Sequence, residues 1–170
     1  MKKSVSLFLC LLLVFSVFSP GPRARALEEV SISAPSAILM EVDSGAVIYD
    51  KNAYEVRFPA SITKIMTILL ACEYIEAGIV EEEEIVTVTE DAWYGMDEES
   101  SNLYITAGEE IRFIDLMYCA MLASANEACN AIAIHTCHDI DTFVKEMNRR
   151  AALLGCKDTK FVTTNGLHDD

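Results

Sequence analysis

Positively charged residues are scarce in this sequence. Its 170 residues hold 13 Lys and Arg against 27 Asp and Glu, which gives a net charge of −14. Nucleic acid phosphates and anionic lipid head groups should repel such a chain. Between Phe58 and Val144 the only basic residues are Lys64 and Arg112, so a cationic cluster for an anionic substrate is hard to place here. The charge balance therefore argues against nucleic acid as a partner.

The first 26 residues have the pattern of a secretory signal peptide. Lys2 and Lys3 precede an apolar stretch from Val5 to Phe18, and Ala24-Arg25-Ala26 then offers an Ala-x-Ala cleavage site. The stretch is short for a membrane span, and an uncleaved anchor is the alternative. We expect cleavage after Ala26 and a secreted, extracytoplasmic chain of residues 27–170. That chain would keep nine basic and all 27 acidic residues, a net charge of −18.

Five of the six cysteines lie beyond the leader. An odd number argues against a fully paired disulfide framework, and most of them lie in apolar helical patterns, where a free thiol behaves as a small hydrophobic side chain. His135-x-Cys137-His138 lacks a second pair of ligands at zinc-like spacing. We expect no metal and no other cofactor.

Hydrophobic patterning predicts strands first and helices afterwards. Apolar runs at 37–42 and 46–49 flank an Asp-Ser-Gly turn, which is typical of a β-hairpin, and their near-continuous apolarity suggests burial on both faces. Residues 61–76 are apolar on almost every side and favour a buried helix. A short strand is expected at 85–89, a brief helix after Thr89, and three amphipathic helices at about 111–122, 127–137 and 139–154.

The pattern alone indicates a mixed α and β domain that is helix-rich in this portion. Two strands cannot cover a buried face, and a sheet usually needs more of them. We therefore expect further strands beyond Asp170, and the chain to be the N-terminal part of a larger catalytic domain.

The spacing of Ser61 and Lys64 is the first candidate for chemistry. Residues three apart share one face of a helix, so a neutral Lys64 amine could accept the proton of the Ser61 hydroxyl. Desolvation on an apolar helix would lower the pKa of Lys64 and favour the neutral form. Ser-x-x-Lys occurs about once by chance in a chain of this length, and a capping Ser with a solvated Lys is the alternative. The apolar helix and the hairpin before it favour a catalytic pair.

Ser124-Ala125-Asn126 is the second candidate, because it lies between two predicted helices. Such a loop can aim a hydroxyl and an amide into a cleft while the helices hold it in place. Capping of the following helix by Ser124 or Asn126 is the alternative. Ser100-Ser101-Asn102 has the same pattern but lies in a polar stretch, so we prefer Ser124 and Asn126.

Together these residues resemble the signature of the penicillin-binding and serine β-lactamase superfamily, in which Ser-x-x-Lys, Ser-x-Asn and Lys-Thr-Gly recur. Within it, the chain looks most like the low-molecular-weight D-alanyl-D-alanine carboxypeptidases. The similar segments are the nucleophile region 60–67, the hairpin with its turn at 43–45, residues 124–128 and residues 159–169. The resemblance implies an α/β (α+β) fold, in which an antiparallel sheet is flanked by helices.

The resemblance also implies a role for each matched residue. Ser61 would attack the carbonyl of the penultimate D-alanine of a peptidoglycan stem peptide, and Lys64 would take its proton. Ser124 would relay a proton toward the departing D-alanine, and Asn126 would hold the substrate amide and Lys64. Water would then hydrolyse the acyl-enzyme. β-Lactams would acylate Ser61 as covalent inhibitors.

Lys-Thr-Gly, the third motif of the superfamily, occurs nowhere in the chain. In the family it supplies the cation for the terminal carboxylate of the substrate, and its strand supplies the second oxyanion donor. The family's C-terminal β-rich domain is also missing, as is the tail through which it reaches the membrane surface. We therefore expect the chain by itself to be weakly active or inactive.

Two other functions fit parts of the pattern. A class A β-lactamase shares the fold and the first motif, but it usually has Ser-Asp-Asn in place of Ser124-Ala125-Asn126 and needs a deacylating Glu. A non-catalytic wall-binding remnant would fit the missing Lys-Thr-Gly.

Overall fold

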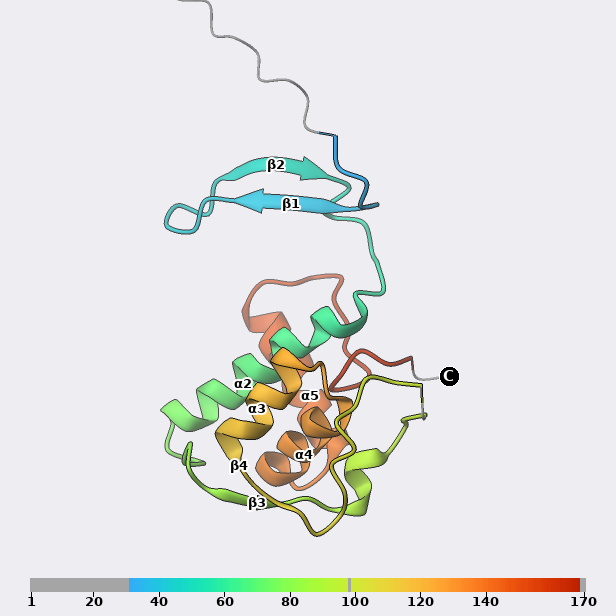
Figure 1. The fold of residues 1–170 in the computed structure, drawn as a ribbon. Coiled ribbons are helices and arrows are strands. Elements are labelled where there is room, and N and C mark those ends of the chain that lie inside the picture. The colour runs from blue at the N-terminus through green and yellow to red at the C-terminus, as the bar shows by residue number, and fades with distance from the viewer. Residues whose placement is uncertain (1–30, 98, 169–170) are drawn as a thin grey trace, which may run out of the picture. The chain divides into compact units, whose positions relative to one another are not determined.

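The computed structural model describes residues 31–97 and 99–168. The chain divides into two compact units, and the boundary between them in the sequence falls between Tyr54 and Glu55 (Figure 1). The predicted signal peptide lies outside the described residues. In the described part of the chain, no helix is both long enough and apolar enough to cross a membrane.

The first unit contains the predicted hairpin. Strand β1 (Ala37–Met40) pairs antiparallel with β2 (Val47–Lys51), with Ala37 opposite Lys51. In the turn, the backbone N–H of Glu41 donates to the Ala46 carbonyl at 2.9 Å, and Gly45 supplies the positive φ of +68° that the turn needs.

Within its own unit, the hairpin does not bury both of its faces, contrary to the expectation from the sequence. Five large apolar side chains of the two strands have exposed fractions between 46% and 65%. These side chains are Ile38, Leu39, Met40, Val47 and Ile48. The physical reason is the one that limits any isolated hairpin: two strands without a second layer cannot shield their own faces.

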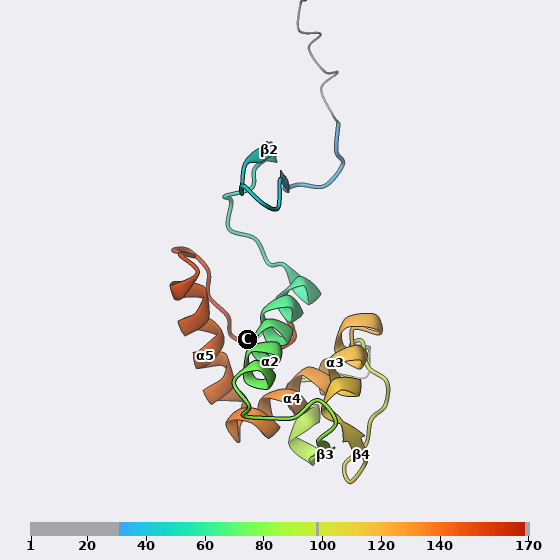
Figure 2. The same cartoon turned by 90° about the vertical axis from the view of Figure 1, so that its left-hand side faces the viewer.

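The second unit is built around α4 (Asn126–Cys137), whose first eight residues are all buried. Helices α2 (Lys64–Glu76), α3 (Phe113–Leu122) and α5 (Ile140–Leu153) each pack against it (Figure 2). Burial of a large apolar side chain contributes roughly 1.5–3 kcal/mol. The largest fully buried apolar side chains are Leu70, Phe113, Leu116, Ile132, Phe143 and Met147. The three helices predicted from periodicity are confirmed to within two residues at either end.

A short two-stranded sheet precedes α3. Strand β3 (Ile85–Thr87) was expected from the sequence, and it pairs antiparallel with β4 (Glu110–Arg112). The helix predicted from about Ile111 therefore begins two residues later, because Ile111 and Arg112 pair with Val86 and Ile85. The brief helix after Thr89 is η2 (Glu90–Trp93), although the Thr89 side chain makes no capping hydrogen bond.

Candidate active site

Ser61 lies in a short 3₁₀ helix, η1 (Ala60–Thr63), and Lys64 is the first residue of α2. The backbone turns sharply just before Ser61, where Ala60 has a positive φ of +49°. The spacing of three residues brings the two side chains together, with Nζ of Lys64 3.2 Å from Oγ of Ser61. The pair expected from the sequence is therefore within hydrogen-bond distance.

Lys64 is buried, with an exposed fraction of 2%. A lysine with its ordinary pKa is charged at neutral pH, and burial of a charge is unfavourable. Burial lowers the pKa of Lys64 from its ordinary value, while the nearby charge of Glu127 opposes this shift. Its Nζ donates a hydrogen bond of 3.0 Å to the backbone carbonyl of Asn165. Lowering the pKa favours the neutral amine, which is the form that can accept a proton from Ser61.

Helix α2 buries one side, on which two polar residues are followed by two apolar ones, and not its whole circumference as the sequence suggested. Its buried residues are Lys64, Thr67, Leu70 and Ala71, whereas Ile65 is 60% exposed. The apolar residues of 61–76 thus predicted the helix correctly, but they did not predict which of its side chains are buried.

Ser124 meets Ser61 from the loop between α3 and α4. It adopts a positive φ of +57°, and its Oγ donates to Oγ of Ser61 at 3.0 Å. Ala125, and not Ser124 or Asn126, is the N-cap of α4, and no side chain caps this end. The capping interpretation of this segment is therefore wrong. The hydroxyl of Ser61 lies between a second hydroxyl and an amine.

Asn126 is buried at the first turn of α4, with an exposed fraction of 3%. Its backbone N–H donates to the carbonyl of Ser101 at 3.0 Å. Among the described residues, no hydrogen bond joins its side-chain amide to Lys64. The expected role of Asn126 in holding Lys64 and the substrate amide stays a prediction.

The neighbouring residue Glu127 was not singled out in the sequence, yet it is fully buried beside the site. Its Oε1 accepts hydrogen bonds from the backbone N–H groups of Leu103 (2.6 Å) and Ile105 (3.4 Å). Its Oε2 has no partner among the described residues. Glu127 thus ties the loop before β4 to the start of α4.

Residues 164–166 complete the surroundings of Lys64, and they come from the far end of the chain. Gly166 has a φ of +89°, and a Cβ at this position would lie 2.0 Å from the carbonyl oxygen of Ala60. Only glycine permits this approach between the backbone beside Asn165 and the turn before Ser61. The sequence signal was the resemblance of 159–169 to the family; local patterning gave none, because the contacts with Lys64 span 101 residues.

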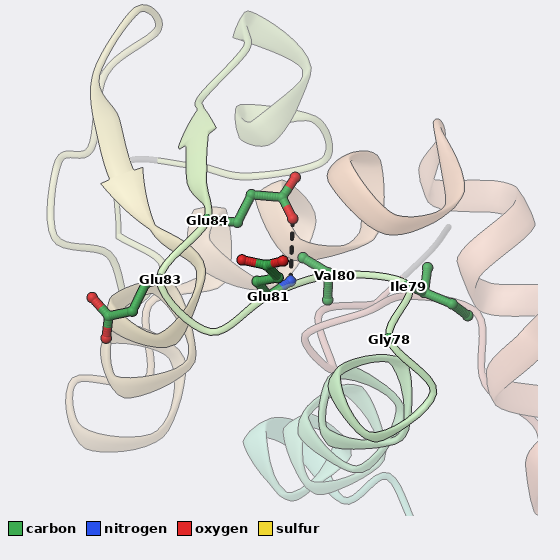
Figure 3. A pocket seen from close by; sticks show the side chains of 6 residues that line it. All are labelled: Gly78, Ile79, Val80, Glu81, Glu83 and Glu84. Atoms are coloured by element: carbon green, nitrogen blue, oxygen red, sulfur yellow. Dashed lines mark hydrogen bonds between the residues drawn. The ribbon is translucent and has the colours of Figure 1, made fainter.

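A separate hollow lies beyond the other end of α2, lined by residues 78–81, 83 and 84 (Figure 3). Three of its residues are the acidic Glu81, Glu83 and Glu84, and Oε2 of Glu84 accepts a hydrogen bond from the backbone N–H of Glu81. A concentration of carboxylates is unsuited to a substrate that ends in a carboxylate. In the part of the chain that the structure describes, no cluster of three His, Cys, Asp or Glu could hold a metal ion.

A serine hydroxyl, a buried lysine amine and a second hydroxyl at hydrogen-bond distance define the chemistry of serine acyl transfer with a lysine base. A family model described as D-alanyl-D-alanine carboxypeptidase matches residues 23–170. The chain belongs to this family.

Known relatives and solved structures agree with this assignment. D-alanyl-D-alanine carboxypeptidase DacF of Bacillus subtilis is 33% identical, over all of this chain and 44% of the relative. Penicillin binding protein 5 from Haemophilus influenzae matches with a TM-score of 0.79 and 30% identity over 84% of this chain and 42% of its own. Penicillin-binding protein D2 of Listeria monocytogenes, solved with ampicillin, matches with a TM-score of 0.71 and 28% identity, covering 85% and 56%.

These matches confirm the predicted α/β fold class and the predicted family. The chain spans 35% to 44% of the length of its first curated relatives.

Proposed function

We propose that this chain supplies the nucleophile and base of a serine-type D-alanyl-D-alanine carboxypeptidase. One observation supports this most strongly: Oγ of Ser61 lies 3.2 Å from Nζ of Lys64 and 3.0 Å from Oγ of Ser124. Burial also lowers the pKa of Lys64, which favours the neutral amine that a general base requires.

In the proposed reaction, neutral Lys64 accepts the hydroxyl proton of Ser61 as Oγ attacks the carbonyl carbon of the penultimate D-alanine. The backbone N–H of Ser61 supports the developing oxyanion. Ser124 then passes its proton to the amine of the terminal D-alanine and takes up the proton held by Lys64, so that the peptide bond breaks, D-alanine leaves and Lys64 is neutral again. A water molecule hydrolyses the ester on Ser61, which releases the shortened stem peptide and restores the serine.

The proposed substrate is the stem peptide of peptidoglycan, and β-lactams are the proposed covalent inhibitors. The Listeria monocytogenes protein solved with ampicillin supports the second point by similarity. Residues 1–26 are proposed as a signal peptide and residues 27–170 as the N-terminal part of a catalytic domain that works outside the cytoplasmic membrane. The matches to penicillin-binding proteins support this location.

The test uses the purified gene product that carries this sequence. We expect a fluorescent penicillin to form a stable adduct and a peptide ending in D-Ala-D-Ala to release D-alanine. Ser61→Ala should reduce both by a factor of roughly 10³ or more. Ser44→Ala, in the hairpin turn, is the matched control and should leave both unchanged.

The other outcomes identify the other functions. Rapid turnover of the penicillin would identify a β-lactamase. A folded wild-type protein that neither binds penicillin nor releases D-alanine would identify a non-catalytic remnant.

A further inference from the structure

Three buried polar side chains join α2, α4 and the segment that follows α5. Oγ1 of Thr67 donates to the backbone carbonyl of Thr164 at 2.5 Å. Oγ1 of Thr164 in turn donates to Oδ1 of Asn130 at 2.6 Å. The exposed fractions of Thr67, Thr164 and Asn130 are 0%, 0% and 2%. Thr164 is therefore held at both its carbonyl and its hydroxyl.

The same network is fixed at its other end. Nδ2 of Asn130 donates to the carbonyls of Ala92 (3.0 Å) and Tyr94 (3.2 Å), which belong to η2 and the residue after it. Every side-chain polar atom of Asn130 is thus used. Fully satisfied buried networks of this kind hold their members in a single arrangement, because breaking one bond leaves another group unpaired in a medium without water.

Asn165 follows Thr164 in the chain, and its backbone carbonyl accepts the hydrogen bond from Nζ of Lys64. We propose that Thr67 and Asn130 are positioning residues for the acylation of Ser61, because they hold Thr164 so that the Asn165 carbonyl keeps the Lys64 amine turned toward the serine. This inference rests on the proposed function and assigns that site two further residues.

The chemistry of a neutral amine explains why the position of the Asn165 carbonyl matters. Such an amine has one lone pair, and rotation about the Cε–Nζ bond decides where the lone pair points. Donation of one N–H to the Asn165 carbonyl at 3.0 Å restricts that rotation and leaves the lone pair free for the Ser61 hydroxyl at 3.2 Å. A carbonyl that shifts releases the amine, and misplacement by about 1 Å can cost about 100-fold in rate.

The decisive variants are Thr67→Val, which replaces the hydroxyl with a methyl group, and Thr67→Ser, which keeps the hydroxyl. The acylation rate with a fluorescent penicillin is measured against pH on the whole gene product. We expect the plateau rate of Thr67→Val to fall between about 10-fold and 100-fold, and that of Thr67→Ser to stay within about threefold of wild type. Thr136→Val is the control, since it removes a hydroxyl that bonds to the Ile132 carbonyl within α4.

A second measurement separates this inference from the proposed function. NMR titration of ¹³C-labelled lysine reports the protonation of Lys64 with or without catalysis. Because the fixed carbonyl stabilises the ammonium form, Thr67→Val should move the titration midpoint of Lys64 to lower pH and Thr67→Ser should restore it. The other titratable groups that act on Lys64, Glu127 and Cys129 on α4, are unchanged in both variants.

If wild-type protein does not react with penicillin, the proposed function fails and the titration alone decides the inference. A Lys64 midpoint that is the same in Thr67→Val and wild type would overturn it. So would a wild-type acylation rate in Thr67→Val, or a Thr67→Ser rate as low as that of Thr67→Val.

Discussion

Two segments of this chain share the Ser-x-Asn pattern, and the structure uses them in different ways. In the segment that starts α4, the hydroxyl of Ser124 lies 3.0 Å from Oγ of Ser61. In the loop before β4, the hydroxyl of Ser100 donates to the carbonyl of Asp97 within its own turn. The first hydroxyl is available for chemistry because local structure does not use it, and the second is already used.

The two asparagines differ in the same manner. The Asn102 side chain donates to the Ser100 carbonyl and accepts from the backbone N–H of Tyr104, so both of its ends close a local turn. Asn126 lies on a helix, and its backbone N–H reaches across to the Ser101 carbonyl. The loop before β4 therefore contacts Asn126 through the Ser101 carbonyl, whereas the segment before α4 contacts Ser61 through the Ser124 hydroxyl. Shared residue types do not give shared roles.

The largest effect on rate that this comparison predicts is at Ser124. Ser124→Ala removes the hydroxyl next to Ser61, and we expect the rates of penicillin acylation and D-alanine release to fall by about 10²-fold or more, which is typical for the loss of a proton-transfer group. The melting temperature should change little, since Ser124 does not cap α4. Near-normal rates would show that Ser124 is a neighbour of Ser61 without a part in proton transfer.

A smaller effect is expected at Glu127, which connects the two segments. Its charge raises the pKa of Lys64 against the larger lowering by burial. Glu127→Gln keeps an oxygen for the N–H groups of Leu103 and Ile105 but removes the charge, so the pKa of Lys64 should fall further. Acylation needs neutral Lys64, so its rate rises with pH through this pKa, and the rising limb should move to lower pH by about one unit at most.

The control for this variant is Glu76→Gln, which removes an exposed charge at the end of α2, the helix that begins with Lys64. Its pH profile should match that of wild type. The assigned role of Glu127 would be contradicted if the rising limb of the pH–rate profile moved to higher pH in Glu127→Gln, or if it moved equally in the control.

The elements that the sequence predicted well are those whose cause is local. Periodicity placed α3, α4 and α5, because apolar residues recur at helical spacing along each of them. The three-residue spacing of Ser61 and Lys64 gave their contact, because helical geometry alone sets it. The choice of Ser124 over Ser100 also agrees with the geometry, and its reason, a loop bracketed by apolar helices, was a local feature too.

What the sequence did not predict depends on contacts between distant segments. Strand β4 exists because Ile111 pairs with Val86, which the local helical pattern could not show. The contacts of Lys64 with Asn165 and of Thr67 with Thr164 span 101 and 97 residues. Apolar residues in the hairpin suggested burial, but their sequence carries no information on whether another layer covers them.

The smallest effect is expected at Ser100, where the comparison predicts almost none. Ser100→Ala removes one exposed hydrogen bond to the Asp97 carbonyl, and such surface changes usually alter stability by no more than about 0.5 kcal/mol. Acylation and D-alanine release should stay at wild-type rates, because the loop contributes the Ser101 carbonyl and not the Ser100 hydroxyl. Ser100→Ala and Ser124→Ala should be assayed in parallel, because the prediction concerns the difference between their rates. A large loss of rate in Ser100→Ala would mean that both Ser-x-Asn segments supply side-chain hydroxyls, and the distinction between backbone and side-chain contributions would fail.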